Sequence, residues 1–255
     1  MHVTFWKRTR ETFTRRRNPL FDPRLGISVW RSVTIDLMHT LHLGVMSTFC
    51  KFAIMKIITD HIVCRMPTIE ETLSNSVIVL AQHWKLWKTN FKRQNPGIKM
   101  SGFRFDAKII GAAGTPKMNL KAAQTWYFLL WLIKYLSEVS HRMDQGDKVL
   151  AAARAMQTLV NTIRDSPMRM PRRAIQQCWD QWLMFLNNTQ DHLEVPKIHL
   201  AMHLLNRMSW FGCPTAYANW ADESANLTFK KCCRGISQTT FEAVVLLEML
   251  ALRKV

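Results

Sequence analysis

Two hydrophobic periods meet at Asp36. Before it, apolar residues alternate with polar ones and share one face of an extended chain: Ile27, Val29, Val33 and Ile35. This alternation predicts a half-buried β-strand that ends at Asp36. After it the period becomes helical, with a stripe of Leu37, Leu41, Val45, Phe49, Phe52 and Met55. We therefore predict a strand followed directly by a helix, with a carboxylate at their junction.

Helical periodicity continues through the middle of the chain. Candidate helices cover 70–93, 120–143, 150–163 and 174–188, separated by turn-rich stretches such as "NPGIKMSGFRF", "GAAGTPK" and "RDSPMRMPRR". The segment 120–143 is hydrophobic on most sides, which is typical of a central helix. Gly and Pro number only nine each in 255 residues, and this scarcity also favours a helix-rich chain.

Three further helices are expected towards the end of the sequence. The first begins at Pro196, a residue suited to the first helical turn, and stops at Gly212. The other two cover 222–234 and 239–253. The predicted fold class is mainly α (α+β), with the strand before Asp36 as its β component.

Charge is the strongest global signal. Lys and Arg number 35 against 18 Asp and Glu, which gives a net charge of +17 at pH 7. Such a surface attracts polyanions by counterion release and long-range steering, so nucleic acid is the favoured partner. A ribosome-like assembly, an anionic membrane surface and simple solubility are the alternatives. Two basic runs are candidate phosphate contacts or nuclear-import signals, although solvated loops look the same: they contain Arg15, Arg16, Arg17, Arg172 and Arg173.

Cysteine spacing and apolar runs bear on location. The six cysteines form no C-x-x-C pair, which is typical of reduced thiols in an intracellular protein. The start "MHVTFWKRTRETFTRRR" lacks the apolar segment of a signal peptide. The apolar run "WYFLLWLI" is far shorter than the roughly 20 residues that span a bilayer. We expect a soluble, nuclear protein with no membrane partner.

Asp36 has two interpretations. A carboxylate at the end of a strand can bind a metal ion or act as a base where the following turn opens into a cleft. It can also be the N-cap of the next helix, and its spacing alone favours this plainer role. His39, three residues on, can share the face of Asp36 and bind the same ion, whereas a core or surface role is the commoner one for a single His.

Two other groups of residues could carry chemistry. His199 and His203 have the i, i+4 spacing that lets two imidazoles meet one zinc ion, but no H-E-x-x-H signature is present. Asp222 and Glu223 precede a basic stretch with Lys230, Lys231 and Arg234. Acids that hold a metal beside cations that hold phosphate are nuclease-like, and acids that complement a helix dipole are the plainer alternative. Motifs of NTPases, dehydrogenases and serine hydrolases are absent from the sequence.

Taken together, distant stretches of the chain resemble one family. "DLMHTLHLGV" resembles the aspartate-bearing motif of Plavaka-like and CACTA-type DNA transposases, roughly D-[LI]-[LM]-H-x-[LI]-x-x-G. "PKIHLAMHLLNRMSWFGCPTAYANWADESANLTFKK" resembles their later motif, in which P-K-x-H precedes a second His, a Gly, a Tyr, an acidic segment and basic residues. "NLKAAQTWYFLLWLI" is similar to a helix of the insertion between the two motifs. The resemblance covers about 27–250.

The resemblance implies an RNase H-like enzyme with an Asp, Asp, Glu triad and a long helical insertion between the second Asp and the Glu. Asp36 would match the second Asp and Glu223 the closing Glu, and together they would hold two Mg²⁺ or Mn²⁺ ions. His39, His199 and His203 match family positions too, and would support the site or bind a structural Zn²⁺. Lys230, Lys231 and Arg234 would face the DNA backbone.

The implied layout is a basic segment at 1–26, an RNase H-like core at 27–60, a helical insertion at 61–195 and core helices at 196–255. Two features depart from the family. The first Asp belongs on a strand before Asp36, where 35 residues are too few for that half of the sheet, and only Asp222 represents the acid before the closing Glu. We therefore expect a truncated or decayed C-terminal portion of a transposase, inactive alone, that binds DNA and can form homo-oligomers. The alternatives are a non-catalytic, basic nucleic-acid-binding or scaffolding helical protein, and a zinc protein that uses His199 and His203.

Overall fold

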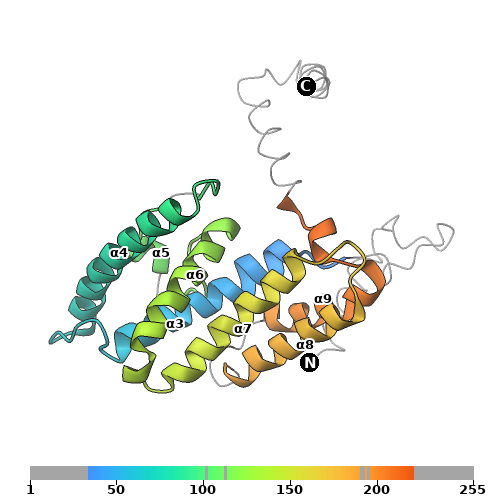
Figure 1. Ribbon diagram of the computed structural model, residues 1–255. Helices are drawn as coiled ribbons and strands as arrows, with labels where there is room; N and C mark the ends of the chain where they lie inside the picture. The colour runs from blue at the N-terminus through green and yellow to red at the C-terminus, as the bar shows by residue number, and fades with distance from the viewer. Residues whose placement is uncertain (1–33, 101–102, 112–113, 190–192, 194–195, 221–255) are drawn as a thin grey trace, which may run out of the picture. The chain divides into compact units, whose positions relative to one another are not determined.

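The computed structural model describes residues 34–100, 103–111, 114–189, 193 and 196–220, and those from Asp36 onward belong to one compact unit (Figure 1). Every regular element among these residues is helical, so a mainly α protein is confirmed for this part of the chain. The predicted strand lies largely outside the described residues, and Thr34 and Ile35 have no regular structure. The predicted helices at 222–234 and 239–253 also lie outside them, and the RNase H-like core stays a prediction.

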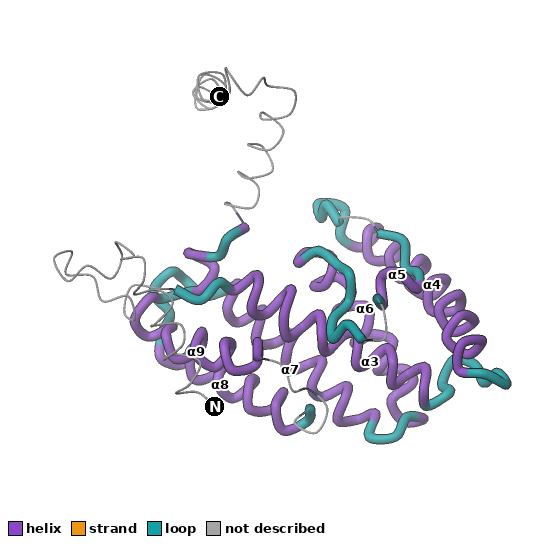
Figure 2. The backbone as a smooth tube through the Cα atoms, turned by 180° about the vertical axis from the view of Figure 1, so that it is seen from behind, coloured by secondary structure: helices purple, strands orange, loops and turns teal. Residues whose placement is uncertain are grey.

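A continuous helix at the centre of this unit consists of η3 (Met38–Met46) and α3 (Ser47–Thr59). α6 and α9 pack against η3, and α4 and α6 pack against α3 (Figure 2). Of the predicted stripe, Leu37, Leu41, Val45 and Phe49 are at most 2% exposed. Met38–Thr59 is long and apolar enough to cross a membrane, but 78% of its most apolar stretch is buried within the protein. This burial is compatible with the expectation of no membrane partner.

The first part of this helix differs from the sequence prediction. η3 is a π-helix, in which the backbone N–H of one residue bonds to the carbonyl five positions earlier. Residues five apart, such as Leu37 and His42, therefore lie on the same side of η3. In an α-helix they would point in different directions. The apolar stripe repeats every four residues and fits either helix, so the sequence pattern could not distinguish them.

The helices of the middle region confirm the sequence pattern, with ends that shift by up to four residues. α4 (Ile69–Gln94) begins with a capping box in which the Thr68 hydroxyl accepts from the Glu71 N–H. The remaining helices are α5 (Ala107–Ile110), α6 (Ala122–Val139), η4 (Ser140–Arg142), α7 (Gly146–Arg164) and α8 (Arg172–Asn187). α7 packs against both α6 and α8. The predicted central helix, α6, has a buried face that includes Phe128, Trp131 and Leu132.

Aromatic side chains fill the contact between α4 and α6. Trp84 stacks on Phe103 with ring centroids 4.7 Å apart and meets Trp131 edge-on at 5.8 Å. The Trp131 indole N–H donates to His83 Nδ1 at 2.9 Å. Large rings bury much apolar area with few rotatable bonds, which explains how this tryptophan-rich chain builds its core.

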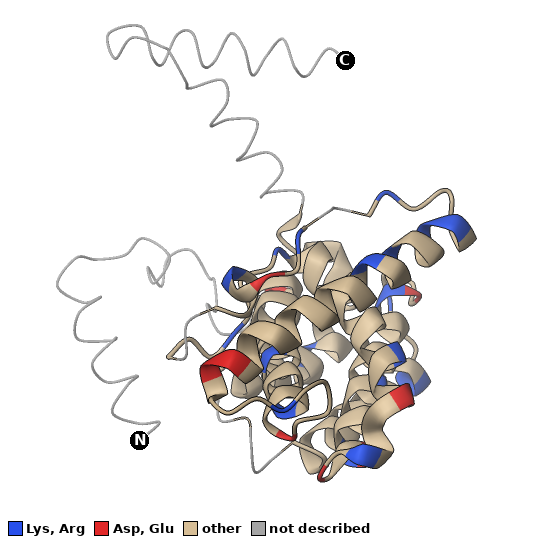
Figure 3. Cartoon of the chain, turned by 90° about the vertical axis from the view of Figure 1, so that its left-hand side faces the viewer, with Lys and Arg blue, Asp and Glu red and all other residues tan. Residues whose placement is uncertain are grey.

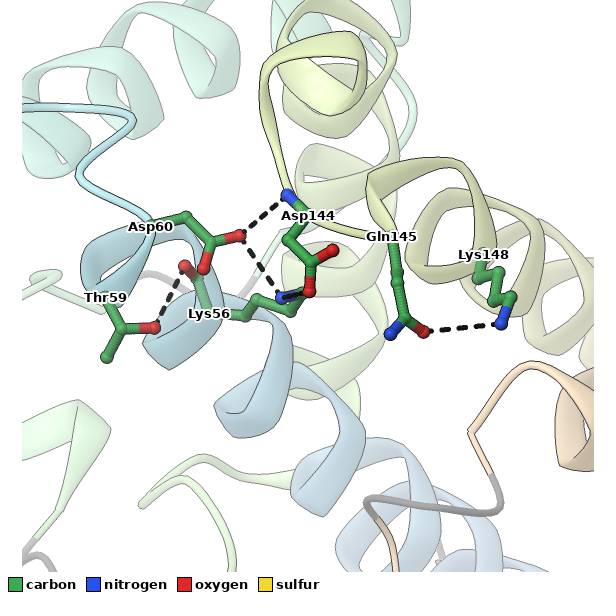
Figure 4. A network of polar contacts seen from close by, with 6 residues as sticks. All are labelled: Lys56, Thr59, Asp60, Asp144, Gln145 and Lys148. Carbon is green, nitrogen blue, oxygen red and sulfur yellow. Dashed lines mark hydrogen bonds and ion pairs between the residues drawn. The ribbon is translucent and has the colours of Figure 1, made fainter.

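A polar network joins the end of α3 to the turn before α7 (Figure 4). The Lys56 ammonium lies 3.2 Å from a carboxylate oxygen of Asp60 and 3.3 Å from one of Asp144. The same Asp60 oxygen accepts the backbone N–H of Asp144 at 3.1 Å. Nearby, the Arg142 guanidinium donates to the carbonyl of Ile62 at 2.9 Å. Each charged group in this network faces a partner, which is typical of a structural clamp.

The last described elements return the chain to the start of η3. α9 (Pro196–Phe211) begins and ends as predicted, and Gly212 follows it with a φ of +78°. A Cβ at Gly212 would lie 2.2 Å from the Met168 carbonyl oxygen, so only glycine fits this turn. η5 (Pro214–Tyr217) then leads to Asn219 and Trp220.

Candidate functional site

The side chain of Asp36 caps the first turn of the central helix, as the plainer interpretation predicted. Its backbone carbonyl accepts the N–H of Thr40 at 3.1 Å, and its Oδ2 accepts the N–H of His39 at 2.8 Å. His39 Nδ1 lies 2.5 Å from the same oxygen. A carboxylate at this position satisfies otherwise unpaired N–H groups and complements the positive end of the helix dipole.

Asp36 also binds a segment 183 positions later in the chain. Its Oδ1 accepts the backbone N–H of Asn219 at 2.8 Å and, more weakly, that of Met38 at 3.4 Å. Burial by itself would raise the pKa of Asp36, but the hydrogen bonds from Asn219 and His39 outweigh it and hold the pKa below its usual 3.8. The side chain therefore works as an ionised tether between the two ends of the described chain.

A second contact brings the same two regions together. A Cβ at Gly44 on η3 would lie 3.0 Å from the His39 carbonyl oxygen and 3.0 Å from Cγ of Lys197 on α9. Further along, the rings of His42 and Trp220 meet edge-on with centroids 5.3 Å apart. The stretches 36–45 and 196–220 are thus in direct contact, although the helices α4 to α8 separate them in the sequence.

His199 and His203 lie on α9 with their rings together. Their Nε2 atoms are 2.9 Å apart and the rings meet edge-on with centroids at 4.5 Å. The i, i+4 spacing thus converges as predicted. Within the described ranges, however, no three His, Cys, Asp or Glu side chains are grouped closely enough to hold one metal ion. The zinc site therefore stays a prediction.

The predicted basic residues divide into two sets. Arg172 and Arg173 open α8, and both are exposed. Cations at a helix N-terminus do not complement the helix dipole, so their place is not explained by helix stability. The other predicted site residues lie outside the described part of the chain: Arg15, Arg16, Arg17, Asp222, Glu223, Lys230, Lys231 and Arg234.

The surface charge is unevenly distributed along α4. This helix faces the viewer in Figure 3, with acidic residues at its start and basic residues at its end. The acids Glu70 and Glu71 lie in the first turn and the bases Lys92 and Arg93 in the last, which complements the helix dipole. The charges at the two ends of α4 are therefore accounted for by helix stability, unlike those at the start of α8.

A cavity of about 360 Å³ is lined by Leu37, the residue after Asp36, and was not predicted. Its walls include Leu37 just before η3, His42 from η3, Trp126 from α6, Arg164 from α7, and Trp220. The side chain of His42 is 6% exposed, and among the described residues its Nδ1 finds no hydrogen-bond partner. Burial lowers the pKa of His42 to about 4, although a hydrogen bond to the backbone of Ala122 opposes this, so the imidazole is neutral near pH 7.

Two free thiols, those of Cys178 and Cys213, are buried in the core. Cys178 is fully buried, and burial raises its pKa to about 12. Cys213 donates to the carbonyl of Ile163 at 3.1 Å. Since a nucleophilic cysteine needs a lowered pKa, Cys178 is a structural residue of the core. Cys213 is buried as well.

Comparisons with protein-family models, with curated proteins and with solved structures found no match for this chain.

Proposed function

We propose that this protein is a transposase-like DNA-binding protein whose basic surface holds the DNA backbone. One observation carries the proposal. The two stretches that resemble transposase motifs touch each other through the Asp36–Asn219 hydrogen bond and the close approach of Gly44 to Lys197. Residues that belong to one site have to meet in the fold, and an accidental resemblance of two remote stretches would not require it. The net charge of +17 supports DNA as the partner.

Asp36 acts in this proposal as a structural residue. Both carboxylate oxygens accept hydrogen bonds from described residues, and together these bonds use the roughly four lone-pair positions that a carboxylate offers. A metal ion at Asp36 would have to displace one of these donors. The described residues therefore do not form a Mg²⁺ or Mn²⁺ site by themselves, and we derive no metal-dependent step from them.

Metal-dependent DNA cleavage is the second candidate, and the position of Asn219 favours it. Glu223 follows Asn219 by four residues, a separation that an extended chain spans in at most about 14 Å. The proposed closing Glu is therefore tied by the covalent chain to the surroundings of Asp36. Cleavage would also require the first Asp of the triad on a further segment, in a protein that supplies it.

Salt-dependent binding of a DNA duplex tests the first candidate. We expect the affinity to fall at least about tenfold between roughly 50 and 200 mM salt, because phosphate contacts release counterions. Arg172→Gln/Arg173→Gln should weaken binding more than Lys134→Gln/Lys148→Gln, which removes the same charge from α6 and α7. An equal loss of affinity in the two double variants would show that the start of α8 makes no special contact with DNA. Affinity that does not change with salt would contradict the proposal.

A nicking assay with Mn²⁺ tests the second candidate in a protein to which an upstream Asp-bearing strand has been added. Glu223→Gln should abolish cleavage while duplex affinity stays within about twofold of the parent protein. Glu70→Gln, which removes an acid from the start of α4, should have no effect. Cleavage that survives Glu223→Gln would contradict the assignment of this residue as the closing Glu. Absence of cleavage in the parent protein would leave DNA binding as the function.

A further inference from the structure

We propose that the cavity between η3, α6, α7 and Trp220 binds a single nucleobase that donates a hydrogen bond to His42. The proposal rests on the proposed function in that the base belongs to nucleic acid. The cavity would thus recognise a base in addition to the DNA backbone. Three features of the cavity support this proposal: the unpartnered Nδ1 of His42, the aromatic walls, and the Arg164 guanidinium at the rim.

His42 supplies the polar recognition. Its ring bonds the backbone of Ala122, while Nδ1 has no partner within the part of the chain that the structure describes. A neutral imidazole carries a proton on one nitrogen and a lone pair on the other, so with the Ala122 bond made by Nε2–H, Nδ1 is an acceptor. A buried acceptor without a donor costs free energy, and a ligand N–H would satisfy it. Every nucleobase has such an N–H on its pairing edge.

The aromatic walls fit a flat ligand. Trp126 and Trp220 flank His42 edge-on, with ring centroids 6.5 and 5.3 Å from its own. Tyr127 and the apolar side chains Leu37 and Val160 are also part of the lining. Base stacking on aromatic rings tolerates any sequence, because every base has a π face. A volume of about 360 Å³ is at the lower end of ligand pockets, which suits one base better than a larger ligand.

Arg164 gives the cavity a charged rim. Its guanidinium carbon lies 5.8 Å from the centroid of the Trp126 ring, and its Nε is 3.0 Å from the Asp165 carboxylate. The side chain is 56% exposed, so it can turn towards the phosphate of the nucleotide whose base is bound. One cavity thus combines the three contacts that bind an unstacked nucleotide: a π face, a hydrogen-bond acceptor and a cation.

Affinity for three versions of one oligonucleotide tests the proposal in the full chain. One central position of a duplex carries an unpaired adenine, an unpaired purine that lacks the 6-amino group, or an abasic site. We expect adenine to bind at least about fivefold tighter than the abasic version, which is the low end of a stacking contribution. The affinity for the oligonucleotide whose purine lacks the 6-amino group should lie between these two values. It should be about threefold weaker than the affinity for the adenine version, because this base cannot donate a hydrogen bond to His42.

Variants assign these differences to the cavity. Trp126→Ala should remove the preference for adenine over the abasic site, and His42→Phe should make adenine and purine equal. Trp210→Ala on α9, where the ring is 74% exposed, and the exposed His141→Phe are the matched controls and should change neither ratio. Because Trp126 is only half-buried, its variant tests the cavity even where His42→Phe does not fold.

The outcomes separate the cavity from the proposed function. Equal affinity of the wild type for all three versions, or a preference that persists in Trp126→Ala, would overturn the nucleobase proposal and leave duplex binding untouched. Binding of free deoxyadenosine monophosphate that Trp126→Ala abolishes, together with equal affinity for the three oligonucleotides, would show that the cavity takes free nucleotides, and it too would overturn recognition of a base within nucleic acid. Loss of all duplex binding with retained nucleotide binding would refute the proposed function alone.

Discussion

The two ends of the central helix differ in how their polar groups are paired. At the Asp60 end, Lys56 lies between two carboxylates, and the same Asp60 oxygen also accepts a backbone N–H (Figure 4). At the Asp36 end, the helix is a π-helix, its cap holds a remote segment, and the nearby His42 Nδ1 lacks a partner among the described residues. Charged groups that each face a partner belong to the structure of the fold, whereas a buried polar atom left without a partner in a cavity points to a ligand. The difference locates the candidate function at the Asp36 end.

The largest expected effect is that of Asp36→Ala. The substitution leaves the N–H groups of His39 and Asn219 without their charged acceptor, so we expect a loss of about 3–4 kcal/mol in the free energy of unfolding. Denaturant titration measures it. Asp106→Ala, which removes the N-cap of the short helix α5, is the control and should cost only about 1 kcal/mol. Equal losses would mean that the hydrogen bond from Asn219 to Asp36 adds nothing to the free energy of unfolding.

His42 should make stability depend on pH. The unfolded chain binds a proton near the usual pKa of 6.5, while the folded protein does so only near 4, so the folded state loses stability as the pH falls through this window. The loss attributable to His42 is on the order of 3 kcal/mol and should be absent from His42→Phe. The exposed His141→Phe should keep the wild-type profile in the same titration. An unchanged slope in His42→Phe would show that the imidazole is accessible to solvent.

Gly44→Ala tests the close approach of η3 and α9. The new Cβ meets the His39 carbonyl and the Lys197 side chain at 3.0 Å, and we expect a net loss of about 1 kcal/mol because crowding exceeds the gain in helix propensity. Gly97→Ala, where a Cβ meets no atom within 4 Å, is the control for a substitution without crowding. Thermal unfolding compares the two, and a stabilised Gly44→Ala protein would contradict close packing at this position.

Asp144→Ala should have the smallest effect. The Asp144 carboxylate is 74% exposed and the Lys56–Asp60 pair remains, so the expected loss is below about 0.5 kcal/mol. The same denaturant titration as for Asp36→Ala measures it. A loss as large as that of Asp36→Ala would erase the contrast between the two ends of the helix.

The sequence predicted the helices well because their signals are local. Pro196 and Gly212 mark the two ends of α9, and a capping pair at Thr68 and Glu71 opens α4. The cap at Asp36 was equally visible, since its partner His39 is three residues away. Periodicity could not reveal the π-helix, because a four-residue repeat suits both helix types.

The parts of the site that the sequence did not predict depend on tertiary contacts. Asn219 reaches Asp36 only through the packing of α9 and η5, and no short-range pattern specifies that hydrogen bond. The cavity likewise needs residues from separate helices, including His42, Trp126 and Arg164. His42 belongs to the quoted motif "DLMHTLHLGV", yet its burial and its open ring nitrogen follow from the fold alone.

Amide hydrogen exchange at Asn219 tests most directly whether Asp36 joins the two motif stretches. The Asn219 N–H, bonded to Asp36 Oδ1 at 2.8 Å, should exchange about 100-fold or more slowly than an unstructured amide, and Asp36→Ala should abolish this protection. The N–H of Ala216, which donates to the Cys213 carbonyl at 3.0 Å, should stay protected in both proteins. Rapid exchange of Asn219 in the wild type, or protection that survives Asp36→Ala, would contradict the account.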